Sequence, residues 1–295
     1  MELTLQHLRL LREVARRSTI TAAADSLGYT RSAVSQQLMG LEKSTGVAVL
    51  ERVGRGVRLT DAGRELVRHA DEVLDGMEAA QAALEAVATS VRGTLVIGIY
   101  ESVAATLLAP LVERLAIDHP DLRVRSRELD PDDAFDAVGH GDVDLAFTLD
   151  YPHDPVPRPD DIAKTSIAEE SFLAVLPASV RAKDVIDLAT LAECQFVAPN
   201  PSSACGRAVM IACRDAGFEP DVAHQVDGYP ATLDLVAAGC GVALVPERSV
   251  LPRPGTHAAR LARPVTRTIE VSHRVSSADR PMIRAAIDTL LDLTR

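Results

Sequence analysis

Four residues that can hydrogen bond to nucleic-acid bases lie close together near the N-terminus, in the stretch TRSAVSQQLMGLE. At helical spacing, Val34, Leu38 and Leu41 share one face of this stretch and predict a buried stripe. Serine, glutamine and arginine have the reach to contact base edges, and arginine can bind guanine through two hydrogen bonds. We therefore expect the other face to read bases in a DNA groove. That face carries Arg31, Ser32, Ser35 and Gln36.

Two short helices separated by a turn would position this face. The first is expected to run to Leu27 and to end at Gly28, because glycine tolerates a positive φ. Thr30 can then cap a second helix from Arg31 to about Ser44 by accepting a hydrogen bond from a free backbone N–H. The alanines at 22–24 allow the two helices to pack closely. This is the helix-turn-helix arrangement, whose second helix enters the major groove.

An amphipathic helix is predicted to precede the pair, from about Thr4 to Arg17. Leu8, Leu11 and Ala15 form its apolar stripe. Three arginines of this helix are expected to lie away from that stripe: Arg9, Arg12 and Arg16.

The stretch VAVLERVGRGVRLT, residues 47–60, predicts a β-hairpin. Two short extended segments flank Gly54-Arg55-Gly56, and the glycines permit a tight turn. Arg55 would lie at the tip of this wing, where an arginine is favoured by the negative potential of a minor groove.

The charge of the chain is unevenly distributed. The whole sequence has a formal net charge of −11, which by itself argues against a nucleic-acid partner. Residues 1–60, however, hold nine basic and five acidic residues, so they carry +4 and the remainder carries −15. A basic N-terminal module on an acidic body indicates that only the module approaches phosphates.

A long helix is predicted to follow the hairpin, from Asp61 to about Thr89, with a hinge at 90–93. Its apolar residues repeat at alternating intervals of four and three, the heptad pattern that favours pairing with an identical helix. An amphipathic helix that lies on its own domain is the alternative. The predicted dimer seam consists of Leu66, Ala70, Val73, Met77, Ala80, Leu84 and Val87.

From residue 94 onward, predicted strands, such as residues 172–176, alternate with predicted helices. This order is typical of an α/β domain with parallel strands. We expect two similar lobes, one formed by 94–163 with 268–295 and the other by 164–267. A ligand cleft is expected between them, near the carboxyl ends of the strands.

Seven residues stand where a predicted strand of this region ends or a helix begins. Free N–H groups at helix starts favour an anion such as a carboxylate. Glu101, Asp150 and Asp154 lie nearby in the sequence and favour a cationic or zwitterionic ligand instead. Helix capping alone would also explain these residues. The candidate effector-binding residues are Tyr100, Ser102, Thr148, Asn200, Ser202, Ser203 and Tyr229.

The sequence offers no catalytic, cofactor or metal motif. Its four cysteines lack C-x-x-C spacing, and its eight histidines lack H-x-x-x-H spacing. Neither a nucleophile elbow, a P-loop nor a dinucleotide-binding glycine pattern after the first strand is present. No apolar run approaches the ~20 residues that span a bilayer, and the N-terminus is unlike a signal peptide. We therefore expect a cytoplasmic protein that is not an enzyme and uses no cofactor or metal.

Three stretches resemble a LysR-type transcriptional regulator: TITAAADSLGYTRSAVSQQLMGLE, VLERVGRGVRLTDAG and VAAGCGVALVP. The resemblance covers the whole chain and implies a bacterial DNA-binding regulator with a winged helix-turn-helix, a linker helix and an α/β domain shaped like a periplasmic solute-binding protein. It implies a small-molecule effector, and promoter DNA with inverted-repeat half-sites. It also implies a homodimer that assembles into a homotetramer.

The resemblance also assigns roles to single residues. Thr30 stands where the family often has a capping serine, Ser35 matches the usual serine, and Arg55 matches the wing arginine. Arg31, Ser32 and Gln36 replace a frequent glutamine, proline and arginine, so the base preference of relatives does not carry over.

Two alternatives differ from this interpretation. One is thiol-based redox sensing, because a peroxide-sensing branch of the family carries two cysteines in the region of Cys205 and Cys213. These two lie eight residues apart on one predicted helix, about 12 Å, and no disulfide closes over that distance without unfolding the helix. The other is a two-lobed solute-binding protein, which would need a signal peptide.

Overall fold

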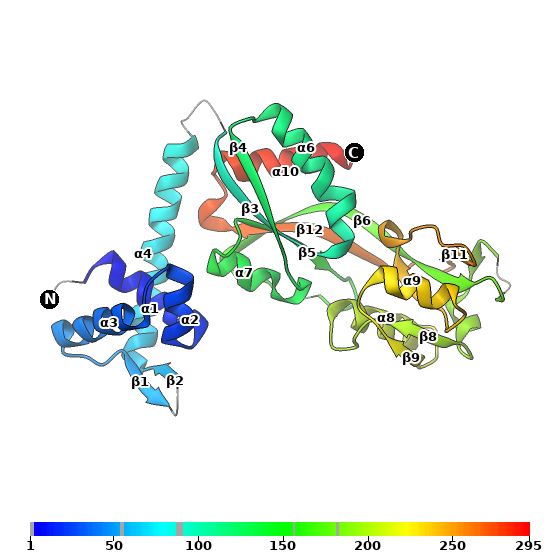
Figure 1. Ribbon diagram of the computed structural model, residues 1–295, viewed down its shortest axis with the longest axis horizontal. Helices are drawn as coiled ribbons and strands as arrows, with labels where there is room; N and C mark the ends of the chain where they lie inside the picture. The colour runs from blue at the N-terminus through cyan, green and yellow to red at the C-terminus, as the bar shows by residue number, and fades with distance from the viewer. Residues whose placement is uncertain (1–2, 54–55, 87–90, 156, 181–182) are drawn as a thin grey trace. The chain divides into compact units, whose positions relative to one another are not determined.

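The computed structural model describes residues 3–53, 56–86, 91–155, 157–180 and 183–295 (Figure 1). The chain divides into two compact units, Met1–Ala88 and Thr89–Arg295. Every helix in the described part is too short or too polar to cross a membrane.

Three helices form the centre of the N-terminal unit: α1 (Leu5–Arg17), α2 (Ile20–Leu27) and α3 (Arg31–Thr45). Each begins after a threonine whose hydroxyl accepts a backbone N–H, which offsets one of the unpaired donors of a helix start. These caps are Thr4, Thr19 and Thr30. Gly28 ends α2 with φ at 69°, so the predicted helix-turn-helix is confirmed.

The predicted apolar face of α3 is buried: Val34, Leu38 and Leu41 pack in one cluster with residues of α1 and α2. The prediction for α1 was partly wrong. Leu10 and Val14 are buried in addition to Leu8 and Leu11, whereas Ala15 is only half-buried. The sequence pattern predicted one packing face, but α1 contacts α2 and α3 as well as a later helix.

That later helix is α4 (Asp61–Ala86), which packs against α1. Arg12 and Arg16, which were predicted to lie away from the apolar stripe of α1, face α4. Arg12 Nη1 lies 3.6 Å from Asp75 Oδ1, and Arg16 Nη2 lies 3.6 Å from Asp71 Oδ1. The two helices are therefore joined by ion pairs as well as by apolar contacts.

The hairpin consists of β1 (Leu50–Val53) and β2 (Gly56–Leu59), which pair in antiparallel register. The predicted tip residue Arg55 lies outside the described residues. Glu42 of α3 fixes the start of the hairpin, because its Oε1 accepts hydrogen bonds from Val49 N at 2.8 Å and from Leu50 N at 3.0 Å. Thr60 Oγ1 then caps α4 by accepting from Gly63 N at 3.0 Å.

The residues of the predicted dimer seam fall into two groups on α4. Leu66 and Ala70 pack with Leu8 of α1, as in the alternative of a helix that lies on its own domain. Val73 and Leu84 are 45% and 76% exposed, and Ala80 is exposed too. Met77 is half-buried, and Val87 lies outside the described residues.

The C-terminal unit is built on a mixed sheet whose first lobe contains parallel strands in the order β4-β3-β5, followed by the antiparallel strand β12. Side chains alternate between its faces. Leu95 and Ile97 of β3 pack in the same cluster as Leu111 and Ile283, whereas Val96 packs against the cluster of Ala137. Helices α6 and α10 thus cover one face and α7 the other (Figure 1). The helices and strands of this lobe are β3 (Gly93–Ile99), α5 (Glu101–Val103), a π-helical turn (Ala104–Leu108), α6 (Ala109–Asp118), β4 (Leu122–Glu128), α7 (Ala134–His140), β5 (Leu145–Asp150), β12 (Thr266–Arg274) and α10 (Pro281–Leu293).

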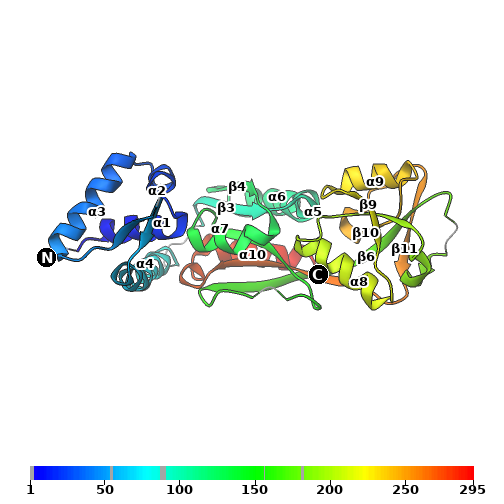
Figure 2. The same ribbon diagram turned by 90° about the horizontal axis from the view of Figure 1, so that it is seen from below.

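The second lobe has helices on both sides of its strands (Figure 2). Phe196 packs with Val209 of α8, and the next residue, Val197, packs with Val236 of α9, so the two helices lie on opposite faces. The elements are β7 (Val185–Ile186), β8 (Gln195–Ala198), α8 (Ala204–Asp215), β9 (Asp221–Gln225), α9 (Tyr229–Ala237), β10 (Ala243–Pro246) and β11 (Thr256–Leu261).

One strand, β6 (Ile162–Pro177), belongs to both lobes. Its residues up to Ser171 pair with β12, and its residues from Phe172 pair with β10 and β11. The change of partner therefore falls at 171/172, whereas the lobe boundary was predicted at 163/164. The chain returns to the first lobe between β11 and β12, whereas the predicted boundary at 267/268 lies two residues inside β12.

Gly63 provides a test of the packing between hairpin and helix. A Cβ at this position would lie 2.1 Å from Val49 O, a backbone atom that cannot swing away. We expect Gly63→Ala to lower the free energy of unfolding by about 2–3 kcal/mol, as overpacking does. Gly76→Ala in the same helix is the control, because an added Cβ there meets nothing within 4 Å. Thermal unfolding of the two variants, followed by circular dichroism, decides; equal stabilities would contradict the account.

Candidate functional site

The outer face of α3 is available for a partner. Arg31, Ser32 and Gln36 are exposed and Ser35 is half-buried, while the opposite face of the helix lies in the core. The capping residue Thr30 is exposed as well, with its hydroxyl 3.1 Å from Ser32 Oγ.

Two further residues of this face were missed. At helical spacing from Ser32 and Gln36 follow Met39, which is 61% exposed, and Lys43, which is exposed too. Their spacing of three and four residues could have identified them. Lysine suits a phosphate, and an exposed methionine can contact an apolar base edge such as a thymine methyl group.

A buried acid holds together α1 and α2, the two helices against which α3 packs. Glu13 is buried, and its Oε1 accepts hydrogen bonds from Arg17 Nε at 2.8 Å and from Ser26 Oγ at 2.6 Å. These two hydrogen bonds replace those that the carboxylate loses to water on burial.

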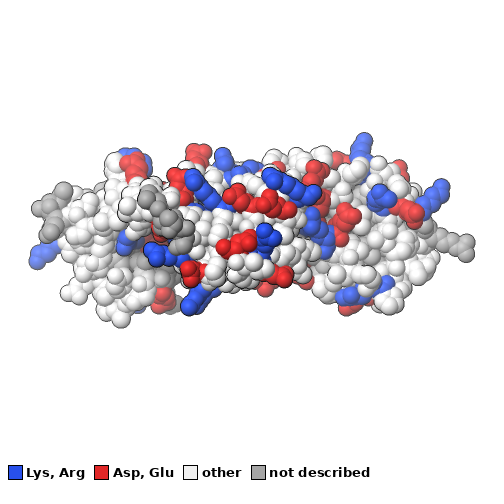
Figure 3. Space-filling model, turned by 90° about the horizontal axis from the view of Figure 1, so that it is seen from above, with Lys and Arg blue, Asp and Glu red and all other residues white. Residues whose placement is uncertain are grey.

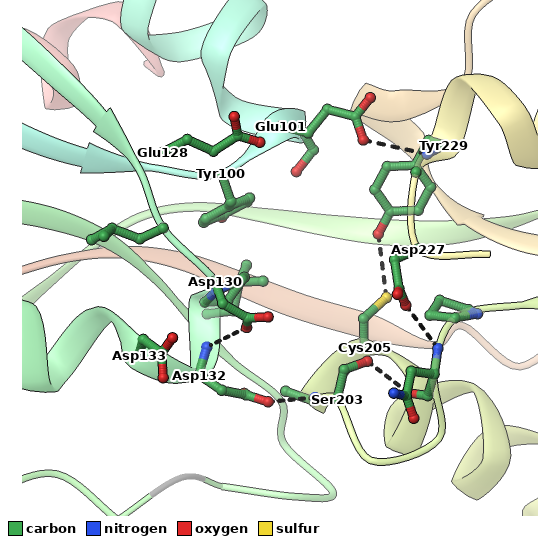
Figure 4. A pocket seen from close by; sticks show the side chains of 18 of the residues that line it. Tyr100, Glu101, Glu128, Asp130, Asp132, Asp133, Ser203, Cys205, Asp227 and Tyr229 are labelled. Atoms are coloured by element: carbon green, nitrogen blue, oxygen red, sulfur yellow. Dashed lines mark hydrogen bonds between the residues drawn. The ribbon is translucent and has the colours of Figure 1, made fainter. Parts of the chain in front are cut away.

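The C-terminal unit contains a cleft of 770 Å³ between its two lobes (Figure 4). Six of the seven predicted effector-binding residues line it: Tyr100, Ser102, Asn200, Ser202, Ser203 and Tyr229. Thr148 is not among the lining residues. It is buried within β5, and its hydroxyl lies 2.9 Å from Ser272 Oγ of β12.

The polar groups at the start of α8 bind mainly to one another. Ser203 Oγ accepts from Gly206 N at 3.1 Å, which is the capping role that was the alternative to ligand binding. Asn200 Oδ1 accepts from Ser202 N at 3.0 Å and from Ser202 Oγ at 2.9 Å. This turn is therefore already formed and satisfied without a ligand.

The floor of the cleft contains a charged residue that sequence reasoning missed. Arg267 lines the cleft and is only 1% exposed. Its Nε donates to Glu170 Oε1 at 2.7 Å, and its Nη2 donates to Ser102 Oγ at 3.0 Å. Burial opposes the charge of Arg267, but the adjacent Glu170 carboxylate raises its pKa, so the guanidinium stays charged. The signal was the alternation of residues 267, 269 and 271, which places Arg267 on the inward face of its strand.

Aromatic rings surround this guanidinium. The Cζ atom of Arg267 lies 5.9 Å from the centre of the Tyr100 ring and 5.8 Å from that of Phe172, within the range of a cation–π contact. Tyr151 Oη accepts from Arg267 Nη1 at 3.5 Å. Burial raises the pKa of the Tyr100 and Tyr151 hydroxyls, so both stay protonated at neutral pH.

Six carboxylates line the cleft, and sequence reasoning named only Glu101 among them. Two of these acids reach from the first lobe to helix starts of the second. Glu101 Oε2 accepts from Tyr229 N of α9 at 3.3 Å, and Asp132 Oδ2 accepts from Ala204 N of α8 at 3.3 Å (Figure 4). The six are Glu101, Glu128, Asp130, Asp132, Asp133 and Asp227.

Two other acids, which in the sequence favoured a cationic or zwitterionic ligand, lie outside the cleft. Asp150 and Asp154 do not line this cleft, and Asp154 Oδ2 accepts from Arg207 Nε at 2.6 Å.

The two cysteines of α8 have different surroundings. Cys205 lines the cleft, and its sulfur lies 3.2 Å from Tyr229 Oη. Cys213 is fully buried, and burial, with a smaller contribution from Glu219, raises the pKa of its thiol to about 12. A thiol that stays protonated is a poor nucleophile. Within the described part of the chain, no group of three or more histidines, cysteines or acids could hold a metal ion.

A winged helix-turn-helix joined to a two-lobed α/β domain with a ligand-sized cleft defines a DNA-binding regulator with a small-molecule domain. Residues 5–64 match the bacterial regulatory helix-turn-helix protein family of the lysR type, and residues 88–295 match the LysR substrate binding domain. The chain therefore belongs to the LysR family of DNA-binding transcriptional regulators. The match at 5–64 is not accounted for by the alternative of a solute-binding protein.

Curated relatives and solved structures agree with this assignment. The transcriptional dual regulator GltC of Bacillus subtilis is 30% identical over 246 residues, which is 82% of this chain and 80% of GltC. The regulator BenM of Acinetobacter baylyi is 29% identical over 252 residues, 82% of this chain and 80% of BenM. A full-length variant of OxyR from Pseudomonas aeruginosa has the same fold, with a TM-score of 0.74 at 22% identity over 98% of this chain and 95% of OxyR. CbnR in complex with its target DNA gives a TM-score of 0.59 at 22% identity over 99% of this chain and 100% of CbnR.

The buried ion pair at the floor of the cleft can be tested by mutation. We expect Arg267→Met to destabilise the C-terminal unit by about 3–5 kcal/mol, because it leaves the carboxylate of Glu170 buried without a counter-charge. Adding Glu170→Gln should recover part of this loss. Arg284→Met, which removes an exposed ion pair with Asp279, is the control and should cost under about 1 kcal/mol.

Urea unfolding followed by tyrosine fluorescence measures this effect. The chain has no tryptophan, and three of its four tyrosines belong to this unit, next to Arg267. If Arg267→Met proved as stable as the control Arg284→Met, the ion pair would not stabilise the fold.

Proposed function

We propose that the outer face of α3 reads base pairs in the major groove of promoter DNA, with Arg55 in the wing contacting the neighbouring minor groove. The observation that supports this most is the division of α3 into a buried apolar face and an exposed hydrogen-bonding face. Thr30, Arg31, Ser32, Ser35 and Gln36 are the proposed contacts.

The charge distribution supports the same role. The first 60 residues carry +4 and the rest −15, so the N-terminal module is the part that phosphates attract. On the face in Figure 3, basic and acidic side chains are interspersed rather than gathered by sign. This mixed distribution argues against a second DNA-binding surface on that face. Because its target is promoter DNA, we propose that the protein works in the cytoplasm and carries out no catalysis.

The exposed apolar residues of α4 support a homodimer. Val73 and Leu84 belong to the predicted seam and are not covered by α1. A second α4 would bury them, and a dimer with twofold symmetry suits inverted-repeat half-sites. We propose further that two dimers form a tetramer, the assembly that the family resemblance implies.

Control by a small molecule is the remaining part of the proposal. The cleft lies between lobes that are connected at only two places in the chain, so a ligand that contacts both lobes favours one arrangement over another. Such a ligand acts only through unequal affinity for the two arrangements. The lobe positions would then alter the spacing of the paired N-terminal modules and the bend of the DNA.

Redox control by the two cysteines of α8 is not supported. Cys213 is buried with a raised pKa, and the two residues are about 12 Å apart along one continuous helix. The likeness to OxyR concerns the fold alone.

The DNA contacts are tested by the double variant Arg31→Ala, Gln36→Ala. We expect its affinity for a fragment of its own upstream promoter to fall about 10- to 100-fold, because two base-contacting side chains are lost. A gel-shift titration at moderate salt measures this. Arg284→Ala, in the other unit, is the matched control. Unchanged retention of DNA by the double variant, with its thermal stability intact, would refute the assignment.

The dimer seam is tested by Val73→Lys with Leu84→Lys. Two lysines on a paired seam would repel their copies in the partner helix, so we expect the molecular mass in solution to fall to half or less of that of the parent assembly. Light scattering on a sizing column measures it. Gln81→Lys, at an exposed position of the same helix outside the seam, should leave the mass unchanged. A double variant with the mass of the parent would exclude this seam.

A further inference from the structure

The lining of the cleft has a large excess of negative charge. Of its 20 residues, six are acids and one is an arginine, which leaves a net charge of −5. The single arginine does not offset this for a ligand, because Arg267 is already paired with Glu170 at 2.7 Å. Figure 4 shows the acids around the same space, from both lobes. A ligand in this space therefore meets carboxylates and no free cation among the described lining residues.

The starts of α8 and α9, which could attract an anion, are already occupied. Glu101 accepts from the first backbone N–H of α9, and Asp132 accepts from that of α8. Each acid comes from the opposite lobe, so the protein supplies its own carboxylates to both sites. An anionic ligand would have to displace one of them while it faced the others, which disfavours the carboxylate class that helix starts alone would indicate.

A hydroxyl without a hydrogen-bond partner indicates that the ligand carries an acceptor as well as a positive charge. Tyr100 is 7% exposed and lines the cleft, and its Oη has no hydrogen-bond partner among the described residues. Because burial raises the pKa of this hydroxyl, it remains a donor. A buried polar group without a partner is uncommon in a native protein and calls for an explanation such as a missing ligand. An oxygen acceptor on a ligand would satisfy it.

A metal ion does not fit these acids. No group of three or more acids, cysteines or histidines in the described part of the chain is arranged to hold one. The carboxylates are spread around a space of 770 Å³, which is the size of an organic ligand site. The complement of this site is a positive charge on an extended molecule rather than a compact ion.

We propose that the effector is a small organic cation that bears an ammonium or guanidinium group and an oxygen acceptor for Tyr100. Asp130 and Asp133 of the first lobe, with Asp227 of the second, contact the cation. The inference rests on the proposed function, in which this cleft is the effector site. A cation between the lobes lowers the repulsion between acids of opposite lobes and so favours their approach.

Binding of matched probes to the full-length protein tests this. 4-Aminobutanamide and 4-guanidinobutanamide, each of which has an amide oxygen for Tyr100, represent the cations, and succinamate and benzoate represent the anions. 4-Aminobutanamide and succinamate differ mainly in the charge of one end group. Tyrosine fluorescence and the shift of the thermal midpoint report binding. We expect the cations to raise the midpoint by several degrees and the anions to leave it unchanged.

Variants connect the binding to named side chains. Asp130→Asn with Asp133→Asn should weaken cation binding about five- to tenfold, since two exposed charges are lost. Tyr100→Phe should weaken it about fivefold by removing one donor. The matched control is Asp118→Asn with Asp292→Asn, at the ends of α6 and α10 outside the cleft, and it should bind as the parent does.

Three results would overturn the inference: binding of the anions in place of the cations, cation binding that the Asp130 and Asp133 changes do not weaken, or no binding by any probe. Promoter retention is measured on the same protein samples. If DNA is retained while the cation prediction fails, only the ligand class is wrong. If DNA is not retained, the proposed function itself fails.

Discussion

The ion pair between Arg267 and Glu170 is the constraint on which the arrangement of the C-terminal unit depends. The two residues face each other in register on β12 and β6, two positions before Phe172, where β6 begins to pair in the second lobe. Both are buried, and their charges are compensated only while both strands keep this register. Ser102 from the start of the first-lobe helix bonds to the same guanidinium. The same ion pair therefore stabilises both the point where β6 passes between the lobes and the floor of the cleft.

The sequence predicted the elements that depend on contacts between residues close in the chain, and it missed those that depend on distant residues. The helix cap Thr30 was readable because a cap is a contact between residues three positions apart. The first part of β6 was not readable, because KTSIAEES contains one large apolar residue, Ile167, and lacks the apolar run of 172–176. That segment is a strand only because β12 pairs with it from 104 positions away, as between Ser166 and Glu270.

The cleft shows the same division. Strand ends and helix starts of an α/β lobe converge whatever the side chains are, so Tyr100, Asn200 and Tyr229 could be placed at the cleft from their positions alone. Thr148 failed because β5 continues to Asp150, which leaves Thr148 inside the sheet rather than at its edge. The acids after β4 and the arginine at the start of β12 come from separate segments, and only the fold shows that they face one space.

The packing of α4 explains how a change at the seam could reach the DNA. The first half of α4 is joined to α1 by buried Ala70 and Leu74 and by the ion pairs of Asp71 and Asp75 with arginines of α1. Glu13 then joins α1 to α2, and Glu42 joins α3 to the hairpin. Val34, Leu38 and Leu41 pack α3 against α1 and α2. Contacts therefore run from α4 through α1 to α3, so a rotation of α4 would carry the outer face of α3 with it. Leu84 in the second half of α4 is exposed, so in the proposed dimer one helix would serve both as the dimer contact and as the support of the proposed DNA-reading face of α3.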